Sequence, residues 1–177
     1  MIKDIGQSRI EVVTGDITQQ SDMQAVVNAA NAHLQPGGGV AGAIHRFAGP
    51  ELNEACRELA PIKPGQAVIT QGFNLPNEFI IHCLGPIYTV DRPSDQLLAD
   101  CYKNAMRLVE QYEIRSIGFP AISAGAFGYP LQEAAQIAID TTRDCLREMD
   151  GSYHVRFVLF TDQDEQAFQK ALEQAAN

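Results

Sequence analysis

The chain lacks any long uninterrupted run of apolar residues, although 45% of its 177 residues are hydrophobic. A helix that crosses a bilayer needs about 20 consecutive, mostly apolar residues, and the apolar stretches here are only a few residues long. Residues 1–6 also show no apolar segment followed by a small-residue cleavage site, the pattern of a secretory signal. We therefore expect no membrane partner and a cytoplasmic location.

Paired cysteines are also missing. The four cysteines are separated by 27, 18 and 44 residues, without a Cys-x-x-Cys pair and without a histidine at ligand spacing; they are Cys56, Cys83, Cys101 and Cys145. This spacing suggests neither a zinc site nor a disulfide framework. We expect buried free thiols and no metal site.

Basic residues are few. Lys and Arg number 13 against 22 Asp and Glu, which gives a formal net charge of −9. Such a surface repels a phosphate backbone, so direct binding of nucleic acid is not expected. An anion that binds this protein must instead be held by local backbone donors.

Hydrophobic periodicity predicts strands and helices in alternation, which is typical of an α/β fold. Expected strands, rich in β-branched or aromatic residues, are 9–13, 25–27, 67–70, 79–83, 116–119 and 155–160. Several are nearly continuous apolar runs, as in strands covered on both faces. Helical spacing appears over 94–112, 131–145 and 164–176, and twice within 40–59. We predict one three-layer α/β/α domain over residues 1–177.

Helix-end signals accompany this pattern. Ser94 is a candidate N-cap, Pro130 suits a first helical turn, and Gly49 followed by Pro50 suits the end of one short helix and the start of the next. These residues set the expected boundaries of the helices.

Two glycine-rich segments, 28–42 and 120–130, each follow an expected strand and precede an expected helix. In an open α/β sheet such turns lie at the carboxyl ends of the strands and present unpaired N–H groups to a ligand. One such loop alone is better explained as a tight turn that needs glycine for its backbone angles. Two loops facing each other favour a diphosphate site made without Lys or Arg.

Familiar nucleotide and hydrolase motifs match poorly. Gly37, Gly39 and Gly42 satisfy G-x-G-x-x-G, but nine residues separate the strand from the first glycine, whereas a Rossmann motif starts at the strand end. No G-x-x-x-x-G-K-[ST] occurs, and Ser123 lacks the leading glycine of a nucleophile elbow. The sequence therefore favours neither a P-loop nucleotidase nor an α/β-hydrolase.

Five ordered blocks together resemble the macrodomain family, over nearly the whole chain. The blocks are Val13-Thr14-Gly15-Asp16-Ile17-Thr18, Val27-Asn28-Ala29-Ala30-Asn31, Gly37-Gly38-Gly39-Val40-Ala41-Gly42-Ala43-Ile44-His45, His82-Cys83-Leu84-Gly85-Pro86, and 119–130. The similarity is to the MacroD-type branch of ADP-ribosyl hydrolases. It implies a mixed, mostly parallel central sheet.

The resemblance assigns the adenine end of an ADP-ribose ligand to residues near two strand ends. Asp16 would accept a hydrogen bond from the adenine amine, with the Ile17 backbone N–H beside it, since a carboxylate only accepts. Phe160 would stack on adenine. Without the family, Asp16 is better explained as a turn cap and Phe160 as ordinary core.

The resemblance places the distal ribose and the diphosphate between the two glycine loops. Asn31 would hydrogen-bond the ribose near its anomeric carbon, Asn28 would support the loop, and Phe127 would cover the ribose and exclude water; these three are the implied catalytic group. A phenylalanine that only closes an apolar gap is the alternative for Phe127. The implied ligand contacts are completed by Gly37, Gly38, Gly39, Val40, Ser123, Ala124, Gly125, Ala126 and Gly128.

One position departs from the family pattern. Ala41 stands where many members of the hydrolase branch have the Asp that activates water, and loss of a sole general base costs about a hundred- to ten-thousand-fold in rate. Some viral and archaeal macrodomains with the same Gly-Gly-Gly-Val-Ala string are hydrolases, in which the substrate diphosphate is proposed to orient the water. His45 lies one helical turn after Ala41, where a packing or hydrogen-bonding role is favoured over proton transfer. His82 is expected to be a hydrogen-bonded core residue.

We therefore expect a macrodomain that removes mono-ADP-ribose from acidic residues of modified proteins by water attack at the distal anomeric carbon, with O-acetyl-ADP-ribose as a further substrate. The alternative is a non-catalytic reader or sensor of ADP-ribose, and a third is an α/β domain with another nucleotide ligand. The expected partners are ADP-ribose and mono-ADP-ribosylated proteins. No metal or redox cofactor is implied, and we expect a monomer.

Overall fold

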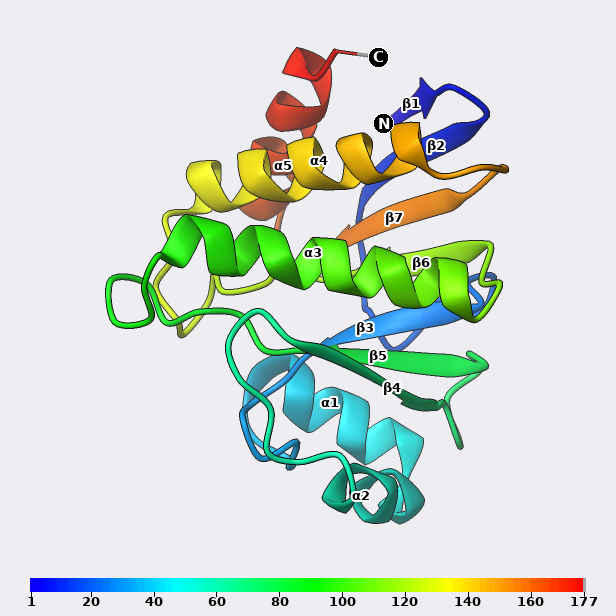
Figure 1. The fold of residues 1–177 in the computed structure, drawn as a ribbon, viewed down its shortest axis with the longest axis vertical. Coiled ribbons are helices and arrows are strands. Elements are labelled where there is room, and N and C mark those ends of the chain that lie inside the picture. Colours follow the sequence, from blue (N-terminus) through cyan, green and yellow to red (C-terminus); the bar gives the residue numbers. More distant parts are fainter. Residues whose placement is uncertain (177) are drawn as a thin grey trace.

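The computed structural model describes residues 1–176, in which seven strands form one sheet in the order β1-β2-β7-β6-β3-β5-β4 (Figure 1). The strands are β1 (Ile2–Ile5), β2 (Ser8–Thr14), β3 (Ala25–Ala29), β4 (Ala67–Gln71), β5 (Phe79–Cys83), β6 (Ser116–Phe119) and β7 (His154–Leu159). Pairing is parallel through β2, β7, β6, β3 and β5, and antiparallel only where β1 and β4 join at the edges. The expected mixed, mostly parallel sheet is confirmed.

Five helices cover the two faces of this sheet (Figure 1). One face packs against α3 (Ser94–Gln111), α4 (Leu131–Glu148) and α5 (Asp162–Gln174), and the other packs against α1 (Gly39–Ala48) and α2 (Pro50–Arg57). Central strands supply alternate residues to the two cores, as their continuous apolar runs predicted: Val27 faces α3 and α4, whereas Val26 faces α1 and α2. The three-layer α/β/α prediction is confirmed.

Several boundaries differ from the sequence-based expectation. The strand β1 was not expected, because its four residues carry mostly exposed or partly exposed side chains at a sheet edge. The last strand ends at Leu159, so Phe160 lies just outside it and is 87% exposed. Ser94 begins α3 rather than capping it, and its hydroxyl donates to the Asp91 carbonyl. Pro130 is the N-cap of α4 rather than a residue of its first turn.

Three of the four thiols are buried, as expected. Cys56 lies in the core beneath α1 and α2, and Cys83 and Cys101 lie in the core beneath α3 and α4. Burial raises the pKa of Cys56 to about 11 and that of Cys101 to about 12. Cys145 is only partly buried. All four are free thiols.

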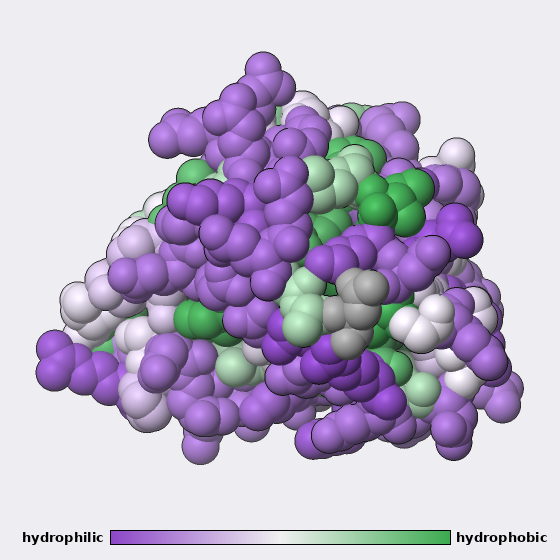
Figure 2. Space-filling view, turned by 90° about the horizontal axis from the view of Figure 1, so that it is seen from above, coloured by the Kyte–Doolittle hydropathy of each residue, from purple (hydrophilic) through white to green (hydrophobic). Residues whose placement is uncertain are grey.

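Polar side chains dominate the outer surface. The view from above shows a largely hydrophilic face with small, separated apolar areas (Figure 2). No helix within residues 1–176 is both long and apolar enough to cross a membrane.

Candidate functional site

Two pockets meet where strands of the sheet end. The first, the Asn31 pocket, has a volume of about 440 Å³ and lies between the end of β3, the start of α1 and the 121–127 loop. The second, the Asp16 pocket, has a volume of about 500 Å³ and is lined by residues after β2 and β7 and by one side of α1. Both are lined by four residues that we call the shared rim: Gly39, Val40, Ala121 and Gly125. The two pockets therefore form one elongated cleft.

The first wall of the shared rim is the start of α1. Its N-cap, Gly38, makes no side-chain hydrogen bond to the helix, and the first turn holds no acidic residue. The first N–H groups of a helix have no partner inside the helix, and the helix dipole makes this end attractive to negative charge. This end of α1 is therefore available to an anion.

A close approach between backbone segments holds this wall in place. The Gly42 N–H donates to the Gly38 carbonyl at 3.4 Å. A Cβ on Gly42 would lie 2.2 Å from the carbonyl oxygen of Gly37, which is far inside van der Waals contact. Only glycine at this position lets the 37–39 loop lie against the first turn of α1.

The second wall is the loop after β6. The backbone N–H groups of residues 124–127 have no hydrogen-bond partner among residues 1–176. The loop is closed by a bond from the Tyr129 N–H to the Ser123 carbonyl at 2.9 Å, and Ser123 has a φ of 64°. The Ser123 hydroxyl donates to the Pro86 carbonyl at 2.8 Å, and a Cβ on Gly85 would lie 2.1 Å from that hydroxyl oxygen. This loop therefore offers free donors from a fixed backbone.

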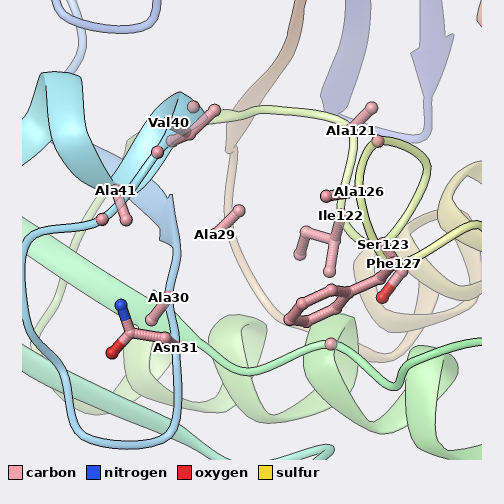
Figure 3. Close-up of a pocket in the computed structure, with 15 residues that line it drawn as sticks. Ala29, Ala30, Asn31, Val40, Ala41, Ala121, Ile122, Ser123, Ala126 and Phe127 are labelled. Carbon is pink, nitrogen blue, oxygen red and sulfur yellow. The ribbon is translucent and has the colours of Figure 1, made fainter.

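Asn31 and Phe127 lie on opposite sides of the Asn31 pocket (Figure 3). The Asn31 amide bridges its own loop: Nδ2 donates to the Gln35 carbonyl at 2.7 Å, and Oδ1 accepts from the Gln35 N–H at 3.0 Å. One further N–H and one further lone pair remain on this amide. Phe127 is half-buried against the core beneath α1, so it closes an apolar gap and also lines the pocket.

Ala41 also lines the Asn31 pocket, although only 5% of its surface is exposed. One turn further along α1, His45 is buried and lines neither pocket. Neither of its ring nitrogens has a hydrogen-bond partner among the described residues, and burial lowers its pKa. Of the two roles favoured for His45, packing therefore agrees with the structure and hydrogen bonding does not.

Asp16 and Ile17 both line the Asp16 pocket. One carboxylate oxygen of Asp16 accepts from the backbone N–H of Thr18 at 2.9 Å and from its hydroxyl at 2.6 Å, which is the turn-capping alternative. The other carboxylate oxygen takes part in neither of these bonds, so Asp16 can cap the turn and accept from a ligand at once.

Phe160 lies at the mouth of the Asp16 pocket and is 87% exposed. Ordinary core, the alternative for this residue, is therefore wrong. A ring left so exposed is free to stack on a planar ligand.

Two of the expected site residues lie outside the cleft. Asn28 is fully buried in β3 and lines neither pocket, so it supports the site from beneath and does not reach a ligand. Gly128 also lines neither pocket; it has a φ of 74°, and its N–H donates to the Gly125 carbonyl at 3.0 Å. All the other expected residues line one pocket or both.

The sequence did not reveal one side of the Asp16 pocket. Arg46 and Phe47 line it from α1, with the Arg46 guanidinium 5.5 Å from the centre of the Phe47 ring. Helical spacing from Val40 through Ala43 to Phe47 was the available signal. The cleft as a whole therefore contains one cation, contrary to the expectation of a site without Lys or Arg, although none lines the shared rim.

Asn28 belongs to a buried hydrogen-bond chain beneath the cleft. Its Nδ2 donates to Nδ1 of His82 at 3.1 Å, so the proton of the neutral ring is on Nε2, which donates to the Thr70 hydroxyl at 2.9 Å. That hydroxyl donates to the Gln71 carbonyl at 3.0 Å. His82 is thus a hydrogen-bonded core residue, as expected.

Acid is expected to destabilise the fold through His82. Burial lowers the pKa of His82 to about 3, whereas the unfolded chain takes up this proton near pH 6.5. The stabilisation from the neutral ring is complete above pH 6.5 and is lost as the pH falls, by about 2 kcal/mol between pH 6.5 and 5. Urea unfolding at the two pH values measures this loss. His82→Gln should remove most of it, and an equal loss in the variant would contradict the assignment.

Known proteins resemble this chain closely. The family model described as "Macro domain" matches residues 27–138. A protein of Citrobacter koseri named "O-acetyl-ADP-ribose deacetylase" is 44% identical over 95% of this chain and 97% of its own length. The structure of an Oceanobacillus iheyensis macrodomain with ADP superposes with a TM-score of 0.94 at 44% identity, over 98% of this chain and 94% of that one. A Trypanosoma brucei macrodomain in complex with ADP-ribose gives 0.85 at 36% identity, over 92% and 68%.

Proposed function

Because this chain belongs to the macro domain family, we propose that its cleft binds ADP-ribose and hydrolyses the ester that joins the distal ribose to an acidic side chain of a modified protein. The observation that carries the proposal is the continuity of two pockets through a rim of free backbone donors. ADP-ribose has the same order of parts: a planar base, a diphosphate and a second sugar.

The order of the two pockets favours one direction for the ligand. Adenine would lie in the Asp16 pocket, with its amine donating to Asp16 and its face against Phe160. The diphosphate would lie at the shared rim, between the start of α1 and the 124–127 backbone. The distal ribose would then lie between Asn31 and Phe127. The similar structures described with ADP and with ADP-ribose are consistent with this choice.

The proposed reaction is a displacement by water at the anomeric carbon. The water oxygen bonds to that carbon, the bond from the carbon to the carboxylate oxygen breaks, and the electron pair leaves with the carboxylate. None of the residues that line the Asn31 pocket has an acidic or basic side chain. We therefore assign the orientation of the water, and the first acceptance of its proton, to the diphosphate of the substrate. This route requires no metal or redox cofactor.

The protein contributes positioning. Asn31 and Phe127 would hold the ribose between them, and the two backbone walls would fix the diphosphate beside the reacting carbon. Such positioning is worth several kcal/mol of the barrier. The same attack would release acetate from O-acetyl-ADP-ribose when the acetyl group is on the anomeric oxygen, which agrees with the name of the Citrobacter koseri relative.

The direct test follows the release of ADP-ribose from a protein mono-ADP-ribosylated on Asp or Glu, with O-acetyl-ADP-ribose in a parallel assay. Release of ADP-ribose from the protein supports the hydrolase. Calorimetric binding of ADP-ribose without release from either substrate would overturn it in favour of the reader, for which Ala41 is the motivating observation. Ala41→Asp is then the first variant to assay, because Ala41 lines the Asn31 pocket.

Asp16→Asn is expected to weaken ADP-ribose binding by about 1–3 kcal/mol, since a charged acceptor is replaced by an amide whose N–H groups would face the adenine amine. The variant keeps one oxygen for the bonds to Thr18, so the turn and the free energy of unfolding should change little. Calorimetry with ADP-ribose and with ribose 5-phosphate, which has no adenine, measures the effect. Unchanged affinity for ADP-ribose would refute the adenine contact.

A further inference from the structure

A third depression, which we call the tyrosine groove, lies beyond the 121–127 loop and has a volume of about 660 Å³. Its walls come from the segment before α3 and from the starts of α3 and α4. The rings of Tyr88 and Tyr129 lie 4.7 Å apart within it, tilted by 54°. Other residues that line the groove include Thr89, Arg92, Asp95 and Glu133.

Tyr129 is 4% exposed, yet its hydroxyl has no hydrogen-bond partner in the described chain. Burial raises the pKa of Tyr129, and the carboxylates of Asp95 and Glu133 raise it further. Tyr129, Asp95 and Glu133 line the same groove, and the Tyr129 hydroxyl is not closed off from solvent, so it opens toward the groove. Burial therefore fixes the ring of Tyr129, while its hydroxyl is left free to bond a ligand in the groove.

The charges of the groove favour a cation. Asp95 and Glu133 are exposed, and neither forms an ion pair with another residue of the described chain. Arg92 is the one cation of the lining, and its Nε donates to the Thr89 carbonyl at 2.8 Å. Two carboxylates against one guanidinium, beside two aromatic faces, suit an ammonium or guanidinium group.

The groove lies next to the Asn31 pocket, because the loop that carries Phe127 runs directly into Tyr129. The Tyr88 N–H donates to the Phe127 carbonyl at 2.9 Å, and Tyr129 follows Phe127 by two residues. Two residues span at most about 7 Å of chain. A side chain a few residues from the modified amino acid can therefore reach the groove while the ribose lies in the pocket.

We propose that the tyrosine groove binds a lysine or arginine side chain of the ADP-ribosylated protein, so that acceptor sites with a neighbouring basic residue are preferred. The inference rests on the proposed function, since it needs the modified ribose in the Asn31 pocket. It adds a contact to the protein part of the substrate, which the ADP-ribose cleft does not provide.

The test uses peptides joined to ADP-ribose through an N-glycosidic amide, which the ester hydrolysis does not cleave, with either Lys or Gln placed one to three residues from the modified position. Calorimetry is expected to give tighter binding of the Lys peptides, by about tenfold at the best position. The double variant Asp95→Asn, Glu133→Gln should remove this preference, because each exposed carboxylate contributes roughly threefold to the affinity for the Lys peptide. Affinity for free ADP-ribose should not change.

A matched control carries Glu110→Gln with Glu173→Gln, which removes two exposed carboxylates from α3 and α5 away from the groove. It should keep the preference for Lys. Equal affinity of the wild type for Lys and Gln peptides, or a preference that survives loss of Asp95 and Glu133, would overturn the groove. Weaker binding of free ADP-ribose by the groove variant would overturn it too. Failure of the wild type to bind free ADP-ribose would instead refute the proposed function and, with it, this inference.

Discussion

Gly42→Ala is expected to reduce the affinity for ADP-ribose by about a hundredfold, because a displaced loop loses backbone hydrogen bonds to the charged diphosphate, each worth about 1.5–3 kcal/mol. The new Cβ would lie 2.2 Å from the Gly37 carbonyl oxygen, so the 37–39 loop must leave its place against α1. The same overpacking should lower the free energy of unfolding by about 1–3 kcal/mol. Calorimetry with ADP-ribose and urea unfolding measure the two effects.

Helix propensity alone would give Gly42→Ala the opposite effect on stability. Alanine inside a helix is ordinarily more stable than glycine by about 1 kcal/mol, so improved stability with unchanged binding would show that the loop does not depend on this contact. Gly118→Ala is the matched control, because a Cβ there meets only side-chain atoms at ordinary distances of 3.5 Å or more. That variant should bind ADP-ribose as the wild type does.

Asn31→Ala is expected to reduce the rate of ADP-ribose release by about a hundredfold, while the affinity for ADP-ribose falls by less than about tenfold. The amide lines the pocket at the ribose end and also bridges to Gln35. The rate should suffer more, because placement of the anomeric carbon affects the transition state more than binding. Single-turnover release and calorimetry separate the two quantities.

Gln35→Ala is the control for this variant. Both bonds between residues 31 and 35 use the Gln35 backbone, so its side chain can be removed without opening the loop. Rate and affinity should stay close to those of the wild type. Equal losses of rate and affinity in Asn31→Ala would mean that Asn31 only holds the ligand.

The sequence predicted those parts of the fold that local pattern determines. Apolar runs such as 79–83 identified buried strands because they are covered on both faces. The strand β1 escaped prediction because Ile2, although apolar, is 55% exposed at the sheet edge. The exposure of Phe160 depends on where β7 ends, and this differed by one residue from the expected end.

Part of the candidate site could be predicted from the sequence, and part could not. The glycine loops were visible as segments that follow strands, and Asn31 through Val40 fall where the pattern placed them. Arg46 was missed because the core-facing side of α1, with Ala41, Ile44 and Ala48, gives no sign that the neighbouring side lines the Asp16 pocket. The tyrosine groove could not be predicted, since Tyr88 and Tyr129 are distant in the sequence and meet only through the packing of two loops.

The buried thiols make the two sides of the sheet separately observable. Cys56 lies in the core beneath α1 and α2, which carry one wall of the cleft, whereas Cys83 and Cys101 lie in the core on the opposite face. A thiol reacts with alkylating agents only as an accessible thiolate. These three thiols are buried, and their raised pKa keeps them protonated. The rate at which each cysteine becomes labelled therefore reports how often its own layer opens, so the ligand-binding layer and the opposite layer can be followed in one molecule.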